Sequence, residues 1–441
     1  MDFMKEYQRK LMTADEAIDA FVKDGDRVQP GGHCAPEPLL RALMRAVKER
    51  RLKGITVYGE WKYLDYGFGD PDLTKDMIQL KCTFYGAMER KYMKTNDIVS
   101  YVPMPLSQQY RYNRDVVRAD VGFVGVTPPD ENGLCSVGPM VAGQRAIELP
   151  YCKKIIGVVN KNIPYVYGDR STFVSVDQMD AIVEEDYEYV TMENPVPTET
   201  DKKIASYITE LVPDGATLQL GVGGIPNAVG YGLRDHKDLG AFTEMFSQSM
   251  GYLQKTGVLN NSKKTFMPGV SVAGFSLGNR EHYDFLDHNK DVYFMPYTVT
   301  NIYQYITKND KMISVNGALM VDLAGQVAAS SLPGIQYSGT GGHMDYAIGA
   351  AASKGGKSFI AFNSTVKKKD GSLISKIVLN MPPGVYVDTP RHSVQYVVTE
   401  YGCVDLFGED VPTRAKKLIS IAHPKFREQL EYDARKQGLI Y

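Results

Sequence analysis

The sequence predicts an α/β protein made of two similar open, mainly parallel α/β domains related by internal duplication. Its length of 441 residues exceeds what a single hydrophobic core usually serves. The order helix, Asp-Gly, strand, glycines, proline and helix occurs twice, and Pro36 follows Asp24 by twelve residues, as Pro226 follows Asp214. Strands and helices alternate through both halves, which is typical of parallel sheets covered by helices.

The first copy starts with the text TADEAIDAFVKDGDRVQPGG. Thr13 and Glu16 have the spacing of a capping box, and the apolar residues that follow recur on one helical face, so a helix is expected here. Asp24-Gly25 ends that helix, and a short strand starts at Arg27. A pair of glycines then leads into the helical segment LLRALMRAVKER.

The second copy reads KIASYITELVPDGATLQLGVGGIPNAVGYGL, and the strand LGAFTEMF follows it as GITVYGEW follows the first copy. Further buried strands are expected in KMISVNGALMVDL, GKSFIAFN and VQYVVTEYG. The closing segment LISIAHPKFREQLEYDARKQG predicts helix interrupted at Pro424. Because the polar segment EDYEYVTMENPVPTETDKK precedes the second copy, the expected domains are residues 1–198 and 199–441.

The composition excludes several classes of protein. Hydrophobic residues make up 43% and charged residues 23%, and the formal net charge is only -2, so nucleic acid is not an expected partner. No segment has the length or apolar character of a membrane span or signal peptide, and a cytoplasmic location is expected. The five cysteines are scattered, and the seven histidines show no paired ligand spacing, so neither a disulfide framework nor a metal site is predicted.

The glycine turn in LQLGVGGIPNAV is the first candidate site. Gly221, Gly223 and Gly224 follow a strand, and glycines let backbone amides approach a ligand closely. Pro226 suits the first turn of a helix, whose start favours negative charge. It also takes the sixth position of the dinucleotide-binding fingerprint, which requires Gly or Ala. The spacing fits both a ligand-contacting turn and an ordinary strand-to-helix turn.

Glu244 in TEMFS is the second candidate. It lies a few residues after Gly240, where a buried strand is expected to end near the glycine turn. A carboxylate with little water around it is costly unless it is paired, so Glu244 is either part of a structural ion pair or a catalytic group. Glu60 is its approximate counterpart in the first copy and competes for the same role.

Two other segments have both a functional and a structural interpretation. YSGTGGHMDYAIGAAASKGGKS, with His343 and Asp345, fits a ligand-binding loop or a loop followed by a tightly packed helix. The run Lys367 to Lys369, followed by Asp-Gly, predicts a solvated hairpin turn, with the steering of ligand phosphates as the alternative.

Several separate segments, taken in their order along the chain, resemble segments of one protein family. LQLGVGGIPNAV, TEMFS, SGTGGHMDY, KKKDGSLISKIV, VVTEYG and IAHPKFREQL resemble the family I CoA-transferases, in the branch that holds 4-hydroxybutyrate and butyrate CoA-transferases and acetyl-CoA hydrolases. The resemblance covers nearly the whole chain. It implies the CoA-transferase fold, with two domains of the NagB/RpiA-like type and the catalytic glutamate in the second.

The resemblance assigns roles to residues of this chain. Glu244 is similar to the family glutamate that is acylated and then carries CoA as a glutamyl thioester. The resemblance therefore assigns the catalytic role to Glu244 and not to Glu60. Family contacts to CoA fall on Gly221, Val222, Gly223, Gly224, Ile225, Leu319 and Gly342. His343 and Tyr346 stand where the family usually has Gln and Phe, and the stretch GEWKYLDYGFGD is unlike 4-hydroxybutyrate enzymes. These departures concern the choice of acyl chain rather than the chemistry.

The implied reaction moves CoA from an acyl-CoA, acetyl-CoA being the expected donor, to a short-chain carboxylate such as 4-hydroxybutyrate or butyrate. CoA and acyl-CoA are then substrates, and no permanently bound cofactor or metal is expected. The family also implies a homo-oligomer, either a dimer or a dimer of dimers. Two alternatives stay open: an acyl-CoA hydrolase that uses the same glutamate, and a non-catalytic acyl-CoA or sugar-phosphate binding protein.

Overall fold

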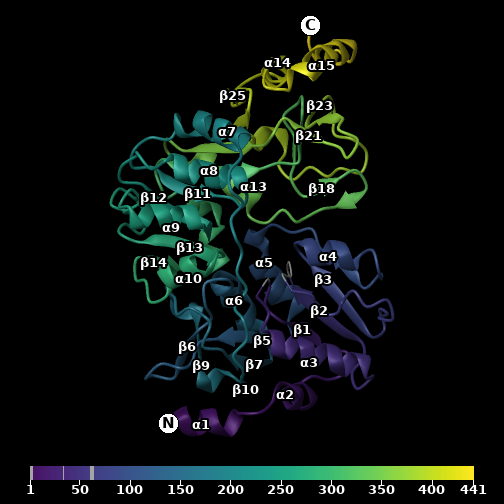
Figure 1. The fold of residues 1–441 in the computed structure, drawn as a ribbon, viewed down its shortest axis with the longest axis vertical. Helices are drawn as coiled ribbons and strands as arrows, with labels where there is room; N and C mark the ends of the chain where they lie inside the picture. The colour runs from purple at the N-terminus through teal and green to yellow at the C-terminus, as the bar shows by residue number, and fades with distance from the viewer. Residues whose placement is uncertain (1–2, 33, 60–63) are drawn as a thin grey trace. The chain divides into compact units, whose positions relative to one another are not determined.

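Residues 3–32, 34–59 and 64–441 are described by the computed structural model, and their contacts form two compact units (Figure 1). Unit 1 comprises Met1–Met192 and Val272–Thr300, and unit 2 comprises Glu193–Ser271 and Asn301–Tyr441. The chain therefore enters each unit twice. The domain boundary near residue 198 stays a prediction.

Unit 1 is built on a parallel sheet flanked by helices. In spatial order its strands are β10 (Ala181–Glu184), β7 (Lys154–Val159), β5 (Val121–Val126), β1 (Arg27–Gln29), β2 (Ile55–Gly59), β3 (Ile78–Cys82) and β4 (Val99–Tyr101). Its helices are α1 (Phe3–Lys10), α2 (Ala14–Phe21), α3 (Glu37–Lys48), α4 (Ala87–Tyr92), α5 (Leu106–Tyr112), α6 (Ala142–Glu148), α10 (Arg280–Leu286) and α11 (Tyr297–Thr300). Its other strands are β6 (Leu134–Ser136), β8 (Tyr167–Gly168), β9 (Phe173–Ser175), β14 (Val292–Phe294) and β13 (Ser271–Ser276), whose first residue belongs to unit 2.

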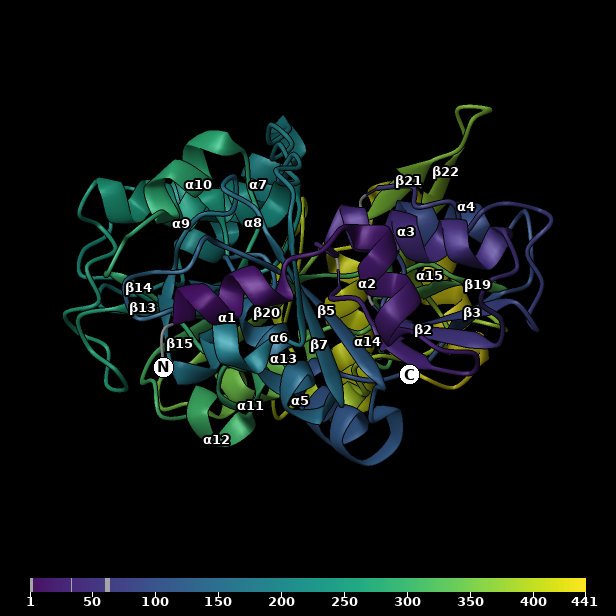
Figure 2. The same ribbon diagram turned by 90° about the horizontal axis from the view of Figure 1, so that it is seen from below.

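Unit 2 repeats this plan. Its sheet runs in the order β25 (Gly402–Asp405), β24 (Tyr396–Thr399), β20 (Lys357–Ala361), β15 (Met312–Gly317), β11 (Thr217–Leu220) and β12 (Gly240–Phe246), and only the β24–β25 pairing within this run is antiparallel. Its helices are α7 (Glu199–Thr209), α8 (Gly224–Gly232), α9 (Gln248–Lys255), α12 (Tyr303–Ile306), α13 (His343–Ala352), α14 (Val411–Ser420) and α15 (Pro424–Lys436). Helices α7 to α9 cover one face of the sheet, and α12 and α13 cover the other (Figure 2).

The two sheets share one strand order, which confirms the predicted duplicated α/β fold. β1 pairs with β2 on one side and β5 on the other, and β7 and β10 lie beyond β5. In unit 2, β11 pairs with β12 and β15, and β20 and β24 lie beyond β15. The registers also correspond, since Arg27 pairs with Thr56 and Thr217 pairs with Gly240.

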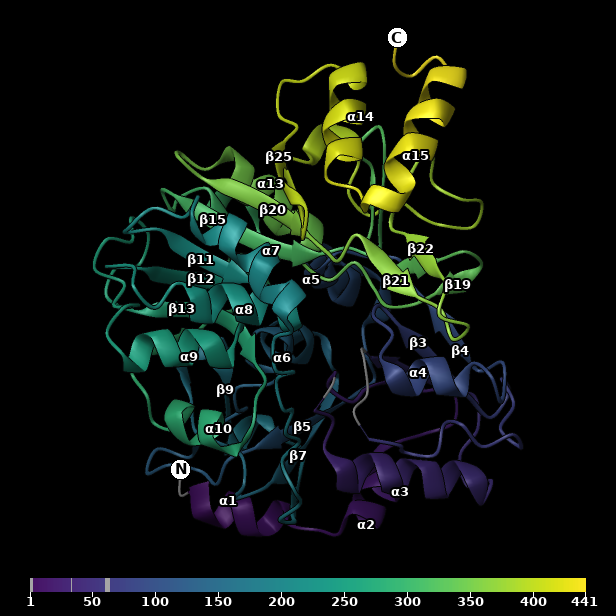
Figure 3. The same cartoon turned by 45° about the horizontal axis from the view of Figure 1, so that its top comes forward.

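Most of the elements expected from the sequence are present. The lysine run forms the antiparallel hairpin of β21 (Thr365–Lys367) and β22 (Leu373–Ser375), whose tip projects as a thin loop (Figure 2). The closing segment folds as α14 and α15, which lie side by side, and α15 begins at Pro424 as expected (Figure 3). The remaining short strands of unit 2 are β16 (Met320–Asp322), β17 (Val327–Ala328), β18 (Ser331–Leu332), β19 (Ile335–Gln336) and β23 (Ile377–Val378).

The central strands are largely buried because helices cover both faces of a parallel sheet. Every residue of β5, VGFVGV, is buried, and β11 is buried throughout as well. Each unit has its own hydrophobic core, one around Leu39 and Val57 and the other around Ile360 and Leu418. In residues 3–32, 34–59 and 64–441, no helix combines the length and apolar character needed to cross a bilayer.

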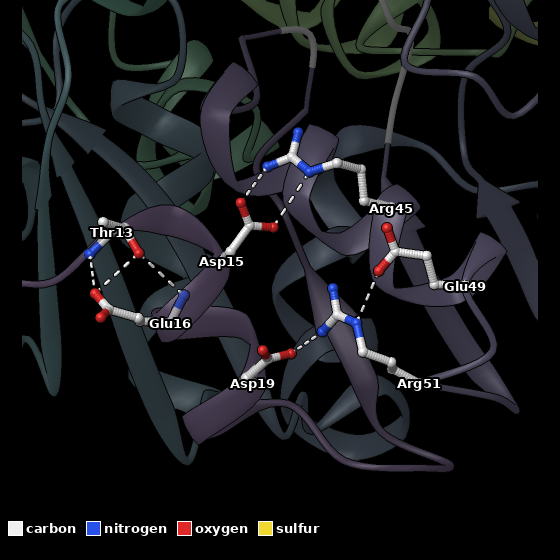
Figure 4. Close-up of polar contacts among 7 residues, drawn as sticks. All are labelled: Thr13, Asp15, Glu16, Asp19, Arg45, Glu49 and Arg51. Atoms are coloured by element: carbon white, nitrogen blue, oxygen red, sulfur yellow. Dashed lines mark hydrogen bonds and ion pairs between the residues drawn. The ribbon is translucent and has the colours of Figure 1, made fainter.

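The N-terminus of α2 has the predicted capping box (Figure 4). The Thr13 hydroxyl accepts from the Glu16 amide at 3.3 Å, and the Glu16 carboxylate accepts from the Thr13 amide at 2.8 Å. Asp15 and Asp19 on the same helix form ion pairs with Arg45 and Arg51, but about half of each aspartate side chain is exposed. Such exposed pairs contribute little to stability.

We expect Thr13→Ala to lower the free energy of opening of α2 by about 1 kcal/mol, because the Ser/Thr cap satisfies an otherwise unpaired helix amide. Amide hydrogen exchange of α2 measures this. Asp19→Asn is the matched control, and its effect should stay within about 0.5 kcal/mol. Equal effects of the two substitutions would contradict the importance of the cap.

Candidate active site

Glu244 lies near the carboxyl end of β12 and is the partly exposed residue of an otherwise buried strand. Its Oε2 accepts a hydrogen bond of 2.9 Å from Nδ2 of Asn301. Asn301 follows α11 and is fully buried. A hydrogen bond between a neutral amide and an ionised carboxylate is stronger than one between two neutral groups, so it fixes the direction of the Glu244 side chain.

Gly342, the N-cap of α13, leaves the space that the Glu244 side chain occupies. A Cβ atom built on Gly342 would lie 1.7 Å from Glu244 Oε2 and 2.3 Å from Asn301 Nδ2. Its φ of -94° is ordinary for any residue. The glycine is therefore required for space and not for backbone conformation.

The first turn of α13 brings two more side chains to this place. Asp345 Oδ2 lies 3.5 Å from Asn301 Nδ2, the same nitrogen that donates to Glu244. Tyr346 is completely buried, and burial together with the charges of Glu244 and Asp345 holds its pKa well above the ordinary value. Its phenol therefore stays protonated through the neutral and mildly alkaline range.

The predicted glycine turn joins β11 to α8. The amide of Gly221 continues the sheet by donating to Val315 O at 2.9 Å, so it is not available to a ligand. Among the described residues, the amides of Val222, Gly223 and Gly224 make no hydrogen bond. Gly223 has a φ of +127°, which side-chain-bearing residues rarely adopt. Unlike the amide of Gly221, these three amides are available to a ligand.

A pair of buried amide side chains packs against this turn. Gln219 on β11 and Asn316 on β15 exchange hydrogen bonds of 3.2 and 3.1 Å. Asn316 Oδ1 also lies 3.4 Å from where a Cβ of Gly221 would stand, so this pair packs directly against the turn. Gln29 is the corresponding residue of the first copy and is buried too. A glutamine repeated in an apolar strand was a signal that sequence reasoning missed.

Leu319 lies half-buried in the turn after β15, which pairs with β11. The turn is held by Lys376, whose Nζ donates to Ala318 O at 3.0 Å. Burial lowers the pKa of Lys376 to about 8, although the charge of Glu400 opposes the shift. The structure thus places Leu319 at the same sheet edge as the glycine turn, and its contact with CoA stays a prediction.

His343 begins α13 next to Gly342 and is buried. Burial lowers its pKa to about 4 against the opposing charge of Asp388, so the imidazole is neutral at pH 7. In the described part of the chain, its Nε2 has no hydrogen-bond partner. Residues 60–63, which include Glu60 and belong to the stretch GEWKYLDYGFGD, lie outside the described residues.

Lys264 is buried beside the start of β12, where its Nζ donates to the carbonyls of Ala241 at 3.0 Å and Val270 at 2.5 Å. Burial lowers its pKa from 10.5 to about 7. Between these two values the unfolded chain binds more protons than the folded chain, so raising the pH stabilises the fold. Below about pH 7 both states are protonated and the dependence ends.

We therefore expect the melting temperature of the wild type to rise relative to Lys264→Met as the pH increases from about 7 to 10. The limiting slope is about 1.4 kcal/mol per pH unit. Thermal melts of both proteins across this range measure the difference. Parallel curves for the two proteins would show that Lys264 is not buried as an ionisable group.

The structure brings together two of the predicted site residues, Glu244 and Gly342, with Asp345 of the candidate loop, and adds Asn301, which the sequence did not identify. Asn301 stands in TNIYQYI, which has no motif, and only the fold places it beside Glu244. In the described residues, no group of three or more His, Cys, Asp or Glu is arranged to hold a metal ion.

The fold is a duplicated α/β fold with mainly parallel sheets, and comparisons with known proteins identify the family. Models of the acetyl-CoA hydrolase/transferase N-terminal and C-terminal domains match residues 1–193 and 278–434. The chain therefore belongs to the acetyl-CoA hydrolase/transferase family, and it is a CoA-transferase.

Individual relatives match over nearly the full length. Butyryl-CoA:acetate CoA-transferase of Anaerostipes caccae is 36% identical and aligns over 99% of this chain and 98% of its own. The 4-hydroxybutyrate coenzyme A transferase of Clostridium kluyveri is 35% identical over 99% of this chain and 100% of its own. The crystal structure of RipA from Yersinia pestis superposes with a TM-score of 0.93, at 31% identity over 100% of both chains.

Proposed function

We propose that this enzyme transfers CoA from an acyl-CoA, with acetyl-CoA as the expected donor, to a short-chain carboxylate such as butyrate or 4-hydroxybutyrate. The observation that carries the proposal is the setting of Glu244. Glu244 is partly exposed near the end of an otherwise buried strand. Its carboxylate accepts a hydrogen bond of 2.9 Å from Asn301 Nδ2 and occupies space left by Gly342. The substrates named for the relatives support the choice of acids.

The proposed reaction consists of two half-reactions, each with two nucleophilic attacks. A Glu244 carboxylate oxygen attacks the acyl-CoA carbonyl carbon, the C–S bond breaks, and CoA leaves as the thiolate from an acyl-glutamyl anhydride. The thiolate then attacks the glutamyl carbonyl carbon, the anhydride C–O bond breaks, and the acid leaves as a carboxylate from a glutamyl-CoA thioester. The second acid reverses both steps, so no net proton is taken up and an ionised carboxylate needs no general base.

Each attack builds negative charge on a carbonyl oxygen, and a well-placed donor contributes about 3 to 4 kcal/mol to lowering the barrier. Asn301 Nδ2 already contacts a Glu244 oxygen and would serve the glutamyl oxyanion. The amides of Val222, Gly223 and Gly224, at the start of α8, are the donors proposed for the acyl oxyanion. Binding of the long CoA arm would help to exclude water from the site and so protect the anhydride from hydrolysis.

A panel of carboxylate acceptors with acetyl-CoA as donor tests the proposal. Acyl-CoA formation from butyrate or 4-hydroxybutyrate with ping-pong kinetics is expected. Borohydride treatment of the acyl-CoA-loaded enzyme should reduce the thioester at Glu244, and mass spectrometry of the peptides locates the change. Modification at another residue, or exchange without any modified residue, would refute the nucleophilic role of Glu244.

A hydrolase on the same residues is the second candidate, because the matching family model includes acetyl-CoA hydrolases. In that case water takes the glutamyl intermediate. Release of free CoA thiol at a rate independent of added carboxylate would favour the hydrolase and reject the transferase. Membership of this family of enzymes argues against the non-catalytic binding protein. The cytoplasmic location and the homo-oligomeric state stay predictions.

A further inference from the structure

We infer that Asp345 is a positioning residue, which keeps the amide nitrogen of Asn301 turned toward Glu244 while Glu244 loses its charge during the reaction. The inference rests on the proposed role of Glu244 as nucleophile. It concerns a single nitrogen atom, Asn301 Nδ2, that lies 2.9 Å from Glu244 Oε2 and 3.5 Å from Asp345 Oδ2.

An asparagine amide can present either its nitrogen or its oxygen to the same place, since the two orientations have nearly the same shape. The nitrogen carries two hydrogens, which match the two carboxylate oxygens around it. A rotation of the amide by 180° would set Oδ1 against these two carboxylates. The two carboxylates therefore favour the orientation in which Asn301 donates.

The two carboxylates have different fates during catalysis. Glu244 becomes a neutral anhydride or thioester, and its carbonyl oxygen then attracts the amide hydrogen much less strongly than the carboxylate did. Asp345 takes no part in the bond changes and keeps its charge. It therefore holds the donor in place in the intermediates, when the next attack builds charge on the glutamyl oxygen.

The setting of Asp345 fits this role. It is the third residue of α13, and a carboxylate in the first turn of a helix is stabilised by the helix dipole. Gly342, the N-cap of the same helix, lies beside this hydrogen bond, since a Cβ atom built there would overlap both Glu244 Oε2 and Asn301 Nδ2. Packing of α13 against β15 and β20 fixes the turn on the sheet. Both carboxylates also act on the buried phenol of Tyr346, which agrees with their common location.

A double-mutant cycle tests the inference with Asp345→Asn, Asn301→Ala, and both together. Asp345→Asn should lower kcat about tenfold with the KM for acyl-CoA unchanged, because the orientation matters in the intermediates. In the Asn301→Ala background the same change should alter kcat less than about twofold. Asp310→Asn, which removes an exposed aspartate charge on unit 2, is the control and should leave kcat unchanged.

A conservative variant separates charge from packing. Asp345→Glu keeps the charge but is longer, whereas Asp345→Asn keeps the shape, so the inference requires the glutamate variant to retain the higher kcat. Higher activity in the asparagine variant, or equal losses in both Asn301 backgrounds, would overturn it. Borohydride labelling of wild-type Glu244 is measured in parallel. Labelled Glu244 with an additive cycle rejects only the role of Asp345, whereas unlabelled Glu244 rejects the proposed function as well.

Discussion

Replacing Glu244 with alanine is expected to lower the rate of CoA exchange by about 10⁴-fold or more, because the group that forms the covalent intermediate is removed. Glu244→Gln should be equally inactive, since it keeps the shape but lacks a nucleophilic carboxylate. The rate of CoA transfer from acetyl-CoA to butyrate measures the loss. Thermal melting should show that the fold survives.

Glu431→Ala is the matched control for this experiment. Glu431 lies on α15, is half exposed, and pairs with Arg435 on the same helix. Its removal should leave exchange at the wild-type rate. If Glu244→Ala retains more than about a tenth of the wild-type activity, the exchange does not pass through that carboxylate.

Adding a single methyl group at Gly342 should be almost as damaging. In Gly342→Ala the new Cβ would stand 1.7 Å from Glu244 Oε2, so the carboxylate must move away from Asn301. A misplacement of about 1 Å at a reacting group can cost about 100-fold in rate. We therefore expect kcat to fall by at least about this factor, with the melting temperature little changed because φ at this position suits alanine.

Gly317→Ala provides the comparison. Gly317 ends β15 in the same unit, and a Cβ built there meets no atom within 4 Å. This variant should keep both activity and stability. Unchanged kcat in Gly342→Ala, measured beside it, would show that Glu244 does not work in the position seen here.

The architecture could be predicted from the sequence because it depends on local and repeated signals. The equal spacing from Asp24 to Pro36 and from Asp214 to Pro226 predicted the duplication, and the common strand order confirms it. The capping box at Thr13 and the helix break before Pro424 are set by neighbours in the chain. Such signals need no knowledge of distant contacts.

The site could be predicted only in part, because half of it comes from tertiary contacts. Glu244 was marked by its charge in an apolar strand. Asn301 is 57 positions away, and no spacing rule connects an asparagine in an irregular segment with a strand end. Asp345 was noticed among glycines, but its link to Glu244 runs through Asn301 and becomes visible only in the fold.

The double passage of the chain through each unit has a consequence for folding during synthesis. Residues 272–300 belong to unit 1 although 79 residues of unit 2 separate them from residue 192. Domains usually fold as units while the N-terminal part emerges from the ribosome first. Here the N-terminal unit can reach its final contacts only after residue 300 has emerged. A gene cut between residues 192 and 193 therefore yields one fragment that lacks residues 272–300 of its own unit and another that carries them as a foreign segment.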